Sequence, residues 1–249
     1  MRIYQPIPLK TDTAITLDEA ASHHVARVLR ATLSDEIIIF NGEGGEFEAT
    51  ITEITKKNVI VYIKKFLARD VESPLELWLA QGISRGEKMD FTIQKAVELG
   101  VTKIIPLLTE RCNVQLNAEK KQKRWEHWQA IIIHACEQSG RTTLPKLSLP
   151  EEFSSWIKKA PKASANFVLT PDAKNAFKIN DIPKTAQILI GPEGGLSAKE
   201  IEEACQLGFT PTKLGPRILR TETAGVAALS VLQCLYGDLV GPPTSNSKN

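Results

Sequence analysis

The sequence contains no long apolar stretch. None of its 249 residues belong to an uncharged apolar run of the roughly 18 residues that a membrane-spanning helix needs. A secretion signal is also missing, because Met1-Arg2-Ile3-Tyr4 leads directly to Pro6 and Pro8. We therefore expect a soluble, unprocessed cytoplasmic protein with no membrane contact.

Cysteine is scarce, with four residues in the chain. None of the four forms a CxxC pair or lies near a histidine at metal-ligand spacing, so we expect no metal site. Three of them, Cys136, Cys205 and Cys234, lie in helical apolar patterns where a small hydrophobic side chain fits. These patterns predict buried free thiols rather than a catalytic cysteine.

Excess charge and nucleotide fingerprints are missing too. The formal net charge is only +2, which neither requires nor excludes a nucleic-acid partner. The chain has no GxGxxG spacing and no glycine-rich loop ending in lysine, so a dinucleotide or nucleoside triphosphate site is disfavoured. At the same time, 42% hydrophobic residues are enough for a substantial core.

The first part of the chain is rich in β-branched residues. Residues 35–40, 46–54 and 58–66 are predicted strands, separated by turn-forming segments, and together they favour a meander or small barrel. A helix is predicted over residues 18–30, with Thr16 or Asp18 as its N-cap. The polar segment 68–74 ends in proline and is typical of a linker.

From Leu75 onward, apolar runs alternate with helical patterns, which predicts an α/β domain with a largely parallel sheet. The expected strands are 75–80, 103–108, 166–169, 187–190 and 212–214. The expected helices are 87–99, 118–138, 198–207 and 222–236. We therefore divide the chain into domains at 1–72 and 73–240, followed by a disordered tail at 241–249.

Two turns in the last third of the chain indicate a ligand site. Each, at residues 190–197 and 214–224, follows a predicted strand and opens a helix, where exposed backbone can bind a ligand. Gly191, Gly194 and Gly195 leave the first turn free of side chains, and Ser197 with Glu200 predicts a capping box. Glu193 would repel a phosphate, so the first turn favours a neutral or cationic ligand.

The second turn carries two arginines and a carboxylate. Ile218 and Leu219 are apolar enough to form the wall of a site for a flat ring. An ordinary helix N-terminus would explain Glu222 by itself, but it does not explain Arg217 and Arg220 beside it.

Together with Leu169-Thr170-Pro171, these turns resemble the ribosomal RNA small subunit methyltransferase E family of the knotted SPOUT class. Three further motifs carry the resemblance: HHxxRVLR from His23, KAVELGV from Lys95 and ACEQSGR from Ala135. The resemblance implies a SPOUT-type parallel sheet with a C-terminal trefoil knot, although chains generally avoid threading. It also implies a small N-terminal PUA-like β-barrel that binds RNA.

The activity implied by the resemblance is S-adenosylmethionine-dependent methylation of N3 of a uridine in the decoding region of 16S rRNA, in the 30S subunit. It also implies a homodimer whose active sites use both subunits. By this resemblance and the pattern above, the expected cofactor-binding residues are Leu169, Thr170, Ile190, Gly191, Glu193, Gly194, Leu214, Pro216, Ile218, Leu219 and Thr223.

Methylation at N3 of uracil requires loss of a proton, so the site needs a base or a cation that stabilises the developing anion. Glu222 is our first candidate for that base or for positioning it. Arg217 and Arg220 are candidates for binding the anionic base or the adjoining phosphate.

RNA contacts are expected at His24, Arg27, Arg30 and, from likeness alone, Arg141. The first three belong to a cluster that also suits a solvated helix face with one packed histidine, and the resemblance favours RNA.

Two other functions fit parts of the sequence. One is a non-catalytic RNA-binding or ribosome-assembly protein that keeps the fold, although such a protein has no need for a cofactor pocket. The other is a small-molecule enzyme with an adenine cofactor, which would leave the N-terminal module without a task.

Overall fold

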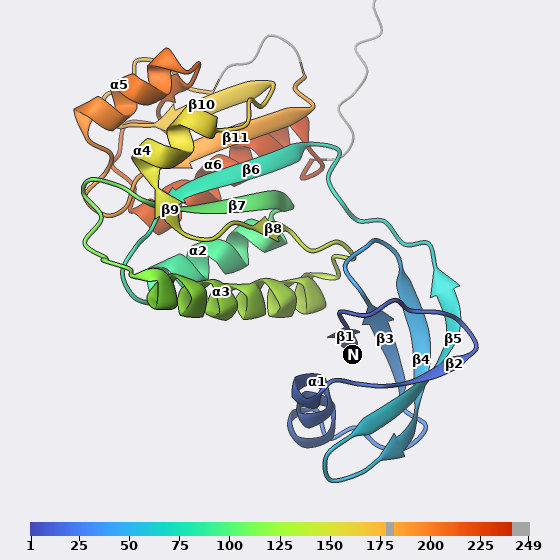
Figure 1. Cartoon of the computed structure of the whole chain (residues 1–249). Coiled ribbons are helices and arrows are strands. Elements are labelled where there is room, and N and C mark those ends of the chain that lie inside the picture. Colours follow the sequence, from blue (N-terminus) through green and yellow to red (C-terminus); the bar gives the residue numbers. More distant parts are fainter. Residues whose placement is uncertain (178–181, 241–249) are drawn as a thin grey trace, which may run out of the picture. The chain divides into compact units, whose positions relative to one another are not determined.

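The computed structural model describes residues 1–177 and 182–240, so the expected disordered tail at 241–249 lies outside the described residues. The chain divides into two compact units. One contains Met1–Glu72 and Ile133–Leu144, and the other contains Ser73–Ile132 and the chain from Pro145 onward. Each unit has its own sheet (Figure 1).

The first unit is built on a five-stranded sheet in the order β1-β3-β4-β5-β2. Its strands are β1 (Arg2–Tyr4), β2 (Thr13–Thr16), β3 (Glu36–Phe40), β4 (Glu46–Ile54) and β5 (Val59–Leu67). β1 runs parallel to β3, and the other neighbours are antiparallel. Because side chains alternate along a strand, one face buries an apolar core that includes Ile37, Ile39 and Val61. The three strands predicted for this region are confirmed, and β1 and β2 add to them.

The helix predicted over residues 18–30 is shorter than expected. Asp18 is its N-cap, and Asp18 Oδ1 accepts a hydrogen bond of 2.8 Å from the N–H of Ala21. The α-helix α1 (Glu19–His23) gives way to the π-helix η1 (His24–Val28). The N–H of Leu29 reaches back five residues to the carbonyl of His24, and the left-handed φ of 52° at Arg30 stops any continuation. The prediction of one continuous α-helix was therefore wrong.

The second unit has a fully parallel sheet in the order β12-β10-β11-β6-β7-β8, with β9 also paired to β7. The strands are β6 (Glu76–Gly82), β7 (Val101–Leu108), β8 (Lys146–Leu147), β9 (Glu151–Glu152), β10 (Ala165–Leu169), β11 (Thr185–Ile190) and β12 (Thr210–Thr212). The helices are α2 (Glu87–Glu98), α3 (Ala118–Ser139), α4 (Phe153–Trp156), α5 (Ala198–Gln206) and α6 (Thr221–Tyr236), with the 3₁₀ turn η2 (Ile157–Lys159). The part of α3 from Ile133 onward is assigned to the first unit. The predicted alternation is confirmed, and the short β8, β9, α4 and η2 are additions.

Helices cover both faces of this sheet (Figure 1). Ala80 and Leu189 belong to one apolar core with Phe153 and Trp156 of α4 and with Ala204 of α5. The next residue along each strand faces the opposite way. On that side, Gln81 and Ile190 lie beside Gly225 of α6, which is also close to Thr92 of α2.

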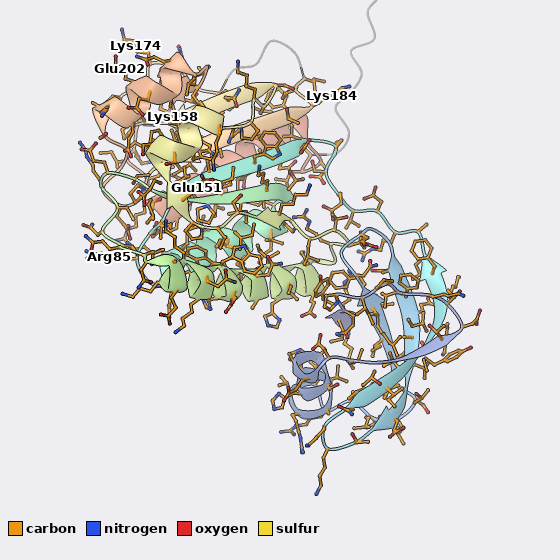
Figure 2. The ribbon with its side chains drawn as sticks, in the orientation of Figure 1. Arg85, Glu151, Lys158, Lys174, Lys184 and Glu202 are labelled. Atoms are coloured by element: carbon orange, nitrogen blue, oxygen red, sulfur yellow. The ribbon has the colours of Figure 1, made fainter. Side chains whose placement is uncertain are left out.

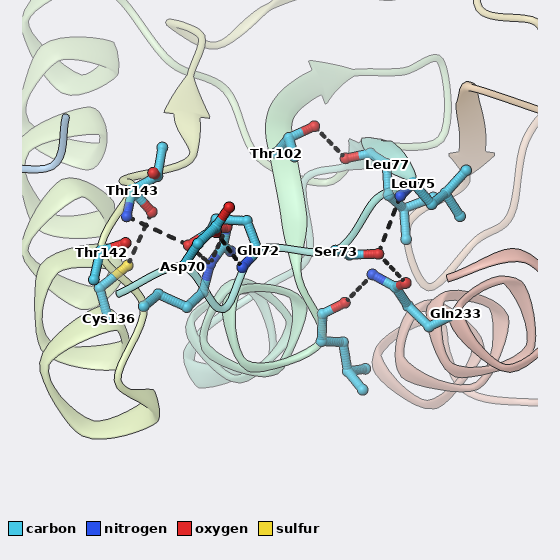
Figure 3. A network of polar contacts seen from close by, with 12 residues as sticks. Asp70, Glu72, Ser73, Leu75, Leu77, Thr102, Cys136, Thr142, Thr143 and Gln233 are labelled. Carbon is cyan, nitrogen blue, oxygen red and sulfur yellow. Dashed lines mark hydrogen bonds and ion pairs between the residues drawn. The ribbon is translucent and has the colours of Figure 1, made fainter. Parts of the chain in front are cut away.

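Hydrogen bonds join the start of β6 to the ends of α2 and α6 (Figure 3). The Ser73 hydroxyl donates to Gln233 Oε1 at 2.7 Å and accepts from the N–H of Leu75 at 3.2 Å. Gln233 Nε2 donates to the carbonyl of Leu99 at 2.8 Å. The buried amide of Gln233 therefore holds α6 against the sheet from its C-terminal end.

The cysteines are all free thiols. Cys136 is buried as predicted, Cys205 is half-buried, and Cys234 is exposed, so the prediction of a buried thiol was wrong for Cys234. Burial raises the pKa of the Cys136 thiol to about 12, which keeps it protonated and unreactive. Among residues 1–177 and 182–240, no helix is both long and apolar enough to cross a membrane, and no three metal-ligating side chains gather.

Candidate active site

The two turns predicted at residues 190–197 and 214–224, called the glycine turns below, lie at the carboxyl-terminal edge of the parallel sheet. The first follows β11, the second follows β12, and the loops after β10, β6 and β7 end at the same edge. This edge is where open α/β sheets bind ligands. A cavity of about 660 Å³ is found there, within the range of sites for small molecules.

Nearly all residues expected in the site line this cavity. Those from the cofactor-binding set are Leu169, Thr170, Ile190, Gly191, Glu193, Gly194, Leu214, Pro216, Ile218 and Leu219. Arg217, Arg220 and Glu222 line it as well, whereas Thr223 is exposed on α6 and does not. The side chain of Ile218 is 84% exposed, so it forms an open rim rather than a buried wall.

The first turn is compact because it has no side chain at Gly191. A Cβ added there would lie 2.6 Å from backbone atoms of both Gly195 and Leu196. Gly195, with φ of 69°, has open space where its Cβ would be. The predicted capping box is confirmed, since Ser197 Oγ accepts from the N–H of Glu200 at 3.2 Å and Glu200 Oε2 accepts from the N–H of Ser197 at 2.8 Å.

A buried set of hydrogen bonds ties the two turns together. The hydroxyl of Thr221, at the start of α6, donates to the carbonyl of Gly191 at 2.7 Å. Gln81 Nε2 donates to that hydroxyl at 2.9 Å and lies 3.3 Å from the same carbonyl. Because Gln81 belongs to β6, three separate chain segments meet at the floor of the cavity. Gln81 Oε1 is buried and finds no hydrogen-bond partner in the part of the chain that the structure describes.

Glu193 is already engaged within the protein. Its Oε1 accepts from the N–H of Arg85 at 3.1 Å and from Lys88 Nζ at 3.2 Å. Burial raises the pKa of Glu193, but hydrogen bonds from its own N–H, from Arg85 and from Lys88 outweigh it and leave the pKa below its usual value. Glu193 is therefore ionised with much of its charge offset by Lys88, which weakens the expectation that it attracts a cationic ligand.

The cavity is rich in positive charge. Five cationic residues line it, namely Lys88, Arg111, Lys213, Arg217 and Arg220, against the three carboxylates Asp172, Glu193 and Glu222. Within the described part of the chain, no carboxylate lies at ion-pair distance from the three arginines. Glu222 Oε2 is buried and has no hydrogen-bond partner among residues 1–177 and 182–240.

The expected RNA-binding residues belong to the first unit. Arg27 and Arg30 are exposed and His24 is half-buried, with its ring 6.1 Å from that of His134. Arg27 lines a depression of about 370 Å³ together with His23 and two lysines, Lys56 and Lys57, from the β4–β5 turn.

Arg141 lies apart from this surface. It is only 4% exposed, and its Nε donates to Glu72 Oε2 at 3.0 Å, so its charge is neutralised in the interior of the first unit. In this position the guanidinium holds the segment before β6 and is closed to RNA.

Sequence reasoning missed Gln81, Lys88, Arg111 and Thr221. Gln81 gave one signal, because it is a polar residue near the end of β6, directly after the apolar run that begins at Leu77. Lys88 and Arg111 follow β6 and β7 at the edge where the two glycine turns lie, but neither belongs to a recognisable motif.

Two protein-family models match the chain. An RNA methyltransferase domain matches residues 71–233, and an RNA methyltransferase PUA domain matches residues 17–64. Among curated relatives, the ribosomal RNA small subunit methyltransferase E of Buchnera aphidicola (subsp. Schizaphis graminum) is 42% identical over 96% of this chain and 97% of that protein. The protein of the same name from Bacillus subtilis is 32% identical over 87% and 90%.

Solved structures agree with these relatives. A methyltransferase from Legionella pneumophila, in complex with the cofactor SAM, has a TM-score of 0.92 and 43% identity, covering 96% of this chain and 98% of that one. The ribosomal RNA small subunit methyltransferase E of Neisseria gonorrhoeae, bound to S-adenosylmethionine, has a TM-score of 0.89 and 37% identity over the same shares.

Proposed function

Because this chain belongs to the ribosomal RNA small subunit methyltransferase E family, we propose that it methylates N3 of a uridine in the decoding region of 16S rRNA. The methyl donor is S-adenosylmethionine, and the substrate is the RNA of the 30S subunit in the cytoplasm. The observation that carries the proposal is the cavity between the two glycine turns, in a chain that matches SAM-bound methyltransferases over nearly its whole length.

The residues around the cavity fit the donor. A Cβ added at Gly195 or Gly215 would meet no atom within 4 Å, so a ligand can approach the backbone of both turns. Leu169, Ile190 and Leu214 supply apolar surface for a purine ring. S-adenosylmethionine, when bound, supplies an electrophilic methyl group.

Positioning of the donor falls to the backbone and to the buried polar contacts behind it. Backbone N–H and C=O groups of the turn that begins at Gly191 would form hydrogen bonds with the edge of the adenine, and Leu219 would cover one side of the ring. The bonds from Gln81 and Thr221 to Gly191 hold this turn in place before any ligand arrives. Such preorganisation lowers the cost of binding.

Proton removal from N3 is assigned to the polar side of the cavity. Glu222 lines the cavity, and its Oε2 has no hydrogen-bond partner within the described residues, so the carboxylate is available to accept a proton or a hydrogen bond from the uracil. Arg217 and Arg220 have no carboxylate partner among the described residues, and their planar forks suit a uracil anion or an RNA phosphate. The negative charge that develops on the base would thus face two cations.

The test is transfer of labelled methyl groups to 30S subunits from cells that lack the enzyme. Glu222→Gln keeps the size of the side chain and removes its basicity, so we expect kcat to fall by about 10²- to 10⁴-fold while SAM affinity is retained. Arg220→Ala should lower kcat/KM by about tenfold or more. If both variants kept wild-type kcat, these roles would be lost, and mapping the modified base identifies the target.

The first unit is proposed to bind the RNA around the target. Arg27, Arg30 and His24 lie on one short segment, and Lys56 and Lys57 add positive charge beside Arg27. Phosphate contacts of this kind are independent of sequence and weaken with salt. The double variant Arg27→Ala, Arg30→Ala should bind 30S subunits more weakly at unchanged SAM affinity, and an unchanged RNA affinity would refute this role.

For the architecture we propose a PUA-like barrel over residues 1–72, a SPOUT domain over 73–240 with a C-terminal trefoil knot, and a homodimer. The knot is proposed from the resemblance to the SPOUT class, in which the buried contacts of α6 with β6, α2 and the turn after β11 would hold its last helix. The dimer is supported by apolar side chains that stay exposed on two helices in mutual contact, Phe91 on α2 at 45% and Leu235 on α6 at 49%. Light scattering in solution measures the mass of the assembly.

A further inference from the structure

One cation of the cavity, Arg111, contacts the first glycine turn directly. Arg111 follows β7 and lines the cavity next to the first glycine turn. Its Nη1 donates to the carbonyl of Gly194 at 3.2 Å. A Cβ added at Gly194 would lie 3.0 Å from the Cβ of Arg111, so the absence of a side chain at Gly194 lets the two segments touch.

The backbone on both sides of Arg111 is also fixed. The N–H of Glu110 donates at 2.8 Å to Oε1 of Glu200, whose carboxylate is buried and already caps α5. The N–H of Cys112 donates to the carbonyl of Thr109 at 3.0 Å, and Cys112 Sγ donates to the carbonyl of Ile83 at 3.3 Å. Three hydrogen bonds therefore hold the backbone of the turn that presents Arg111.

The guanidinium keeps most of its binding capacity. A guanidinium has five N–H donors, and the bond to Gly194 uses one of them. No carboxylate pairs with it in residues 1–177 and 182–240, and the residue is exposed at the rim. Lys88, from the first turn of α2, lines the same cavity but shares its charge with Glu193 at 3.2 Å.

We propose that Arg111, with Lys88 beside it, binds a backbone phosphate of the RNA next to the target nucleotide. This inference rests on the proposed function. An exposed arginine with a free fork suits a bidentate phosphate contact, and its fixed base lowers the entropy lost on binding. Because Arg111 is exposed, it meets the incoming RNA, whereas the apolar residues deeper in the cavity meet the adenine. Arg217 and Arg220 remain available for the base itself.

The carboxylate of the methyl donor is the competing anion. If Arg111 bound that carboxylate, its removal would weaken SAM binding. If it binds an RNA phosphate, its removal weakens RNA binding alone and lowers the dependence of RNA affinity on salt by about one phosphate contact.

The experiment compares the full-length wild type with Arg111→Gln and Arg111→Ala. Glutamine keeps a donor for the carbonyl of Gly194 and removes the charge, which preserves the fold if alanine does not. The matched control is Lys158→Ala, an exposed lysine on η2 (Figure 2) that forms no ion pair within the described residues and is absent from the cavity lining. Titration calorimetry gives the SAM Kd, binding to 30S subunits at several salt concentrations gives the salt slope of RNA affinity, and methyl transfer gives kcat and KM.

We expect both Arg111 variants to raise KM for 30S subunits by about tenfold or more and to reduce the salt slope of RNA affinity by about 0.7 to 0.9, with SAM Kd within about twofold of wild type. Lys158→Ala should match wild type. An unchanged KM and salt slope in Arg111→Gln would overturn the proposal, and so would a SAM Kd weakened as much as KM. Absence of methyl transfer by the wild type would instead refute the proposed function, so the two failures are distinguishable.

Discussion

Thr221→Val tests whether the floor of the cavity depends on one hydroxyl. Valine has nearly the shape of threonine but cannot form hydrogen bonds, so the change removes the bond from Thr221 to the carbonyl of Gly191 at 2.7 Å and the bond from Gln81 at 2.9 Å. Thr221 is 7% exposed and Gln81 is 0% exposed, so water cannot replace the lost partners. Gln81 Nε2 still reaches the carbonyl of Gly82 at 3.0 Å.

The expected cost follows from these two bonds. A buried hydrogen bond contributes about 0.5 to 1.5 kcal/mol net, so the loss of two should lower the free energy of unfolding by about 1 to 3 kcal/mol. The partial compensation from Gly82 places our expectation in the lower half of that range. SAM affinity should fall as well, because the hydrogen bond of 2.7 Å that joins the two turns is lost and only the longer contact from Gln81 Nε2 to the carbonyl of Gly191, at 3.3 Å, remains.

Urea unfolding followed by tryptophan fluorescence measures the change in the free energy of unfolding of the second unit, which contains Thr221. All four tryptophans, Trp78, Trp125, Trp128 and Trp156, belong to the second unit, so their emission reports on the domain that carries the cavity. Thr221→Ser is the matched control because it keeps the hydroxyl. If Thr221→Val and Thr221→Ser unfolded at the same urea concentration and bound SAM equally, the anchoring role of Thr221 would be refuted.

Two further predictions concern backbone space and pH. Gly191→Ala should destabilise the second unit and abolish SAM binding, because the added Cβ would lie 2.6 Å from backbone atoms. The control Gly225→Ala should be tolerated, since the nearest atom to its Cβ would be 3.4 Å away. Equal SAM affinities of the two variants by calorimetry would refute this prediction. A hydrogen bond that His134 Nδ1 donates to the Glu137 carboxylate raises the pKa of His134 despite partial burial. The pair therefore stabilises the first unit below pH about 6.5 and loses that effect as the pH rises through the higher folded pKa. Denaturation of His134→Gln at pH 5.5 and 8 should show a smaller pH dependence than wild type, and an identical dependence would contradict the assignment.

Local signals made much of the fold predictable. The strands and helices of the second unit follow from the period of apolar residues, and the parallel sheet follows from their alternation. The capping box at Ser197 and Glu200 involves residues three apart, so its sequence pattern is sufficient. The short β8 and β9 have two residues each, too few for any period to appear.

Other features depend on contacts between distant segments and could not be predicted. The change from α1 to the π-helix η1 leaves no mark in the apolar spacing, which is similar for both helices. The exposure of Cys234 depends on which side of α6 meets the sheet. For Arg141, likeness suggested an RNA contact, but the carboxylate that pairs with its buried charge belongs to Glu72, 69 residues away in the sequence.

The site shows the same division between local and distant information. Its two turns were recognisable because glycine and proline determine the conformation of their own backbone. The lack of a side chain at Gly191 indicates a tight turn whichever strands lie beside it. Gln81, Thr221 and Arg111 act through partners 140, 30 and 83 residues away. Those pairings depend on which strands become neighbours in the sheet. The spacing of hydrophobic residues along the sequence does not reveal the strand order. A polar residue at the carboxyl end of a buried parallel strand, as at Gln81, is thus the local signal that a site of this kind leaves in a sequence.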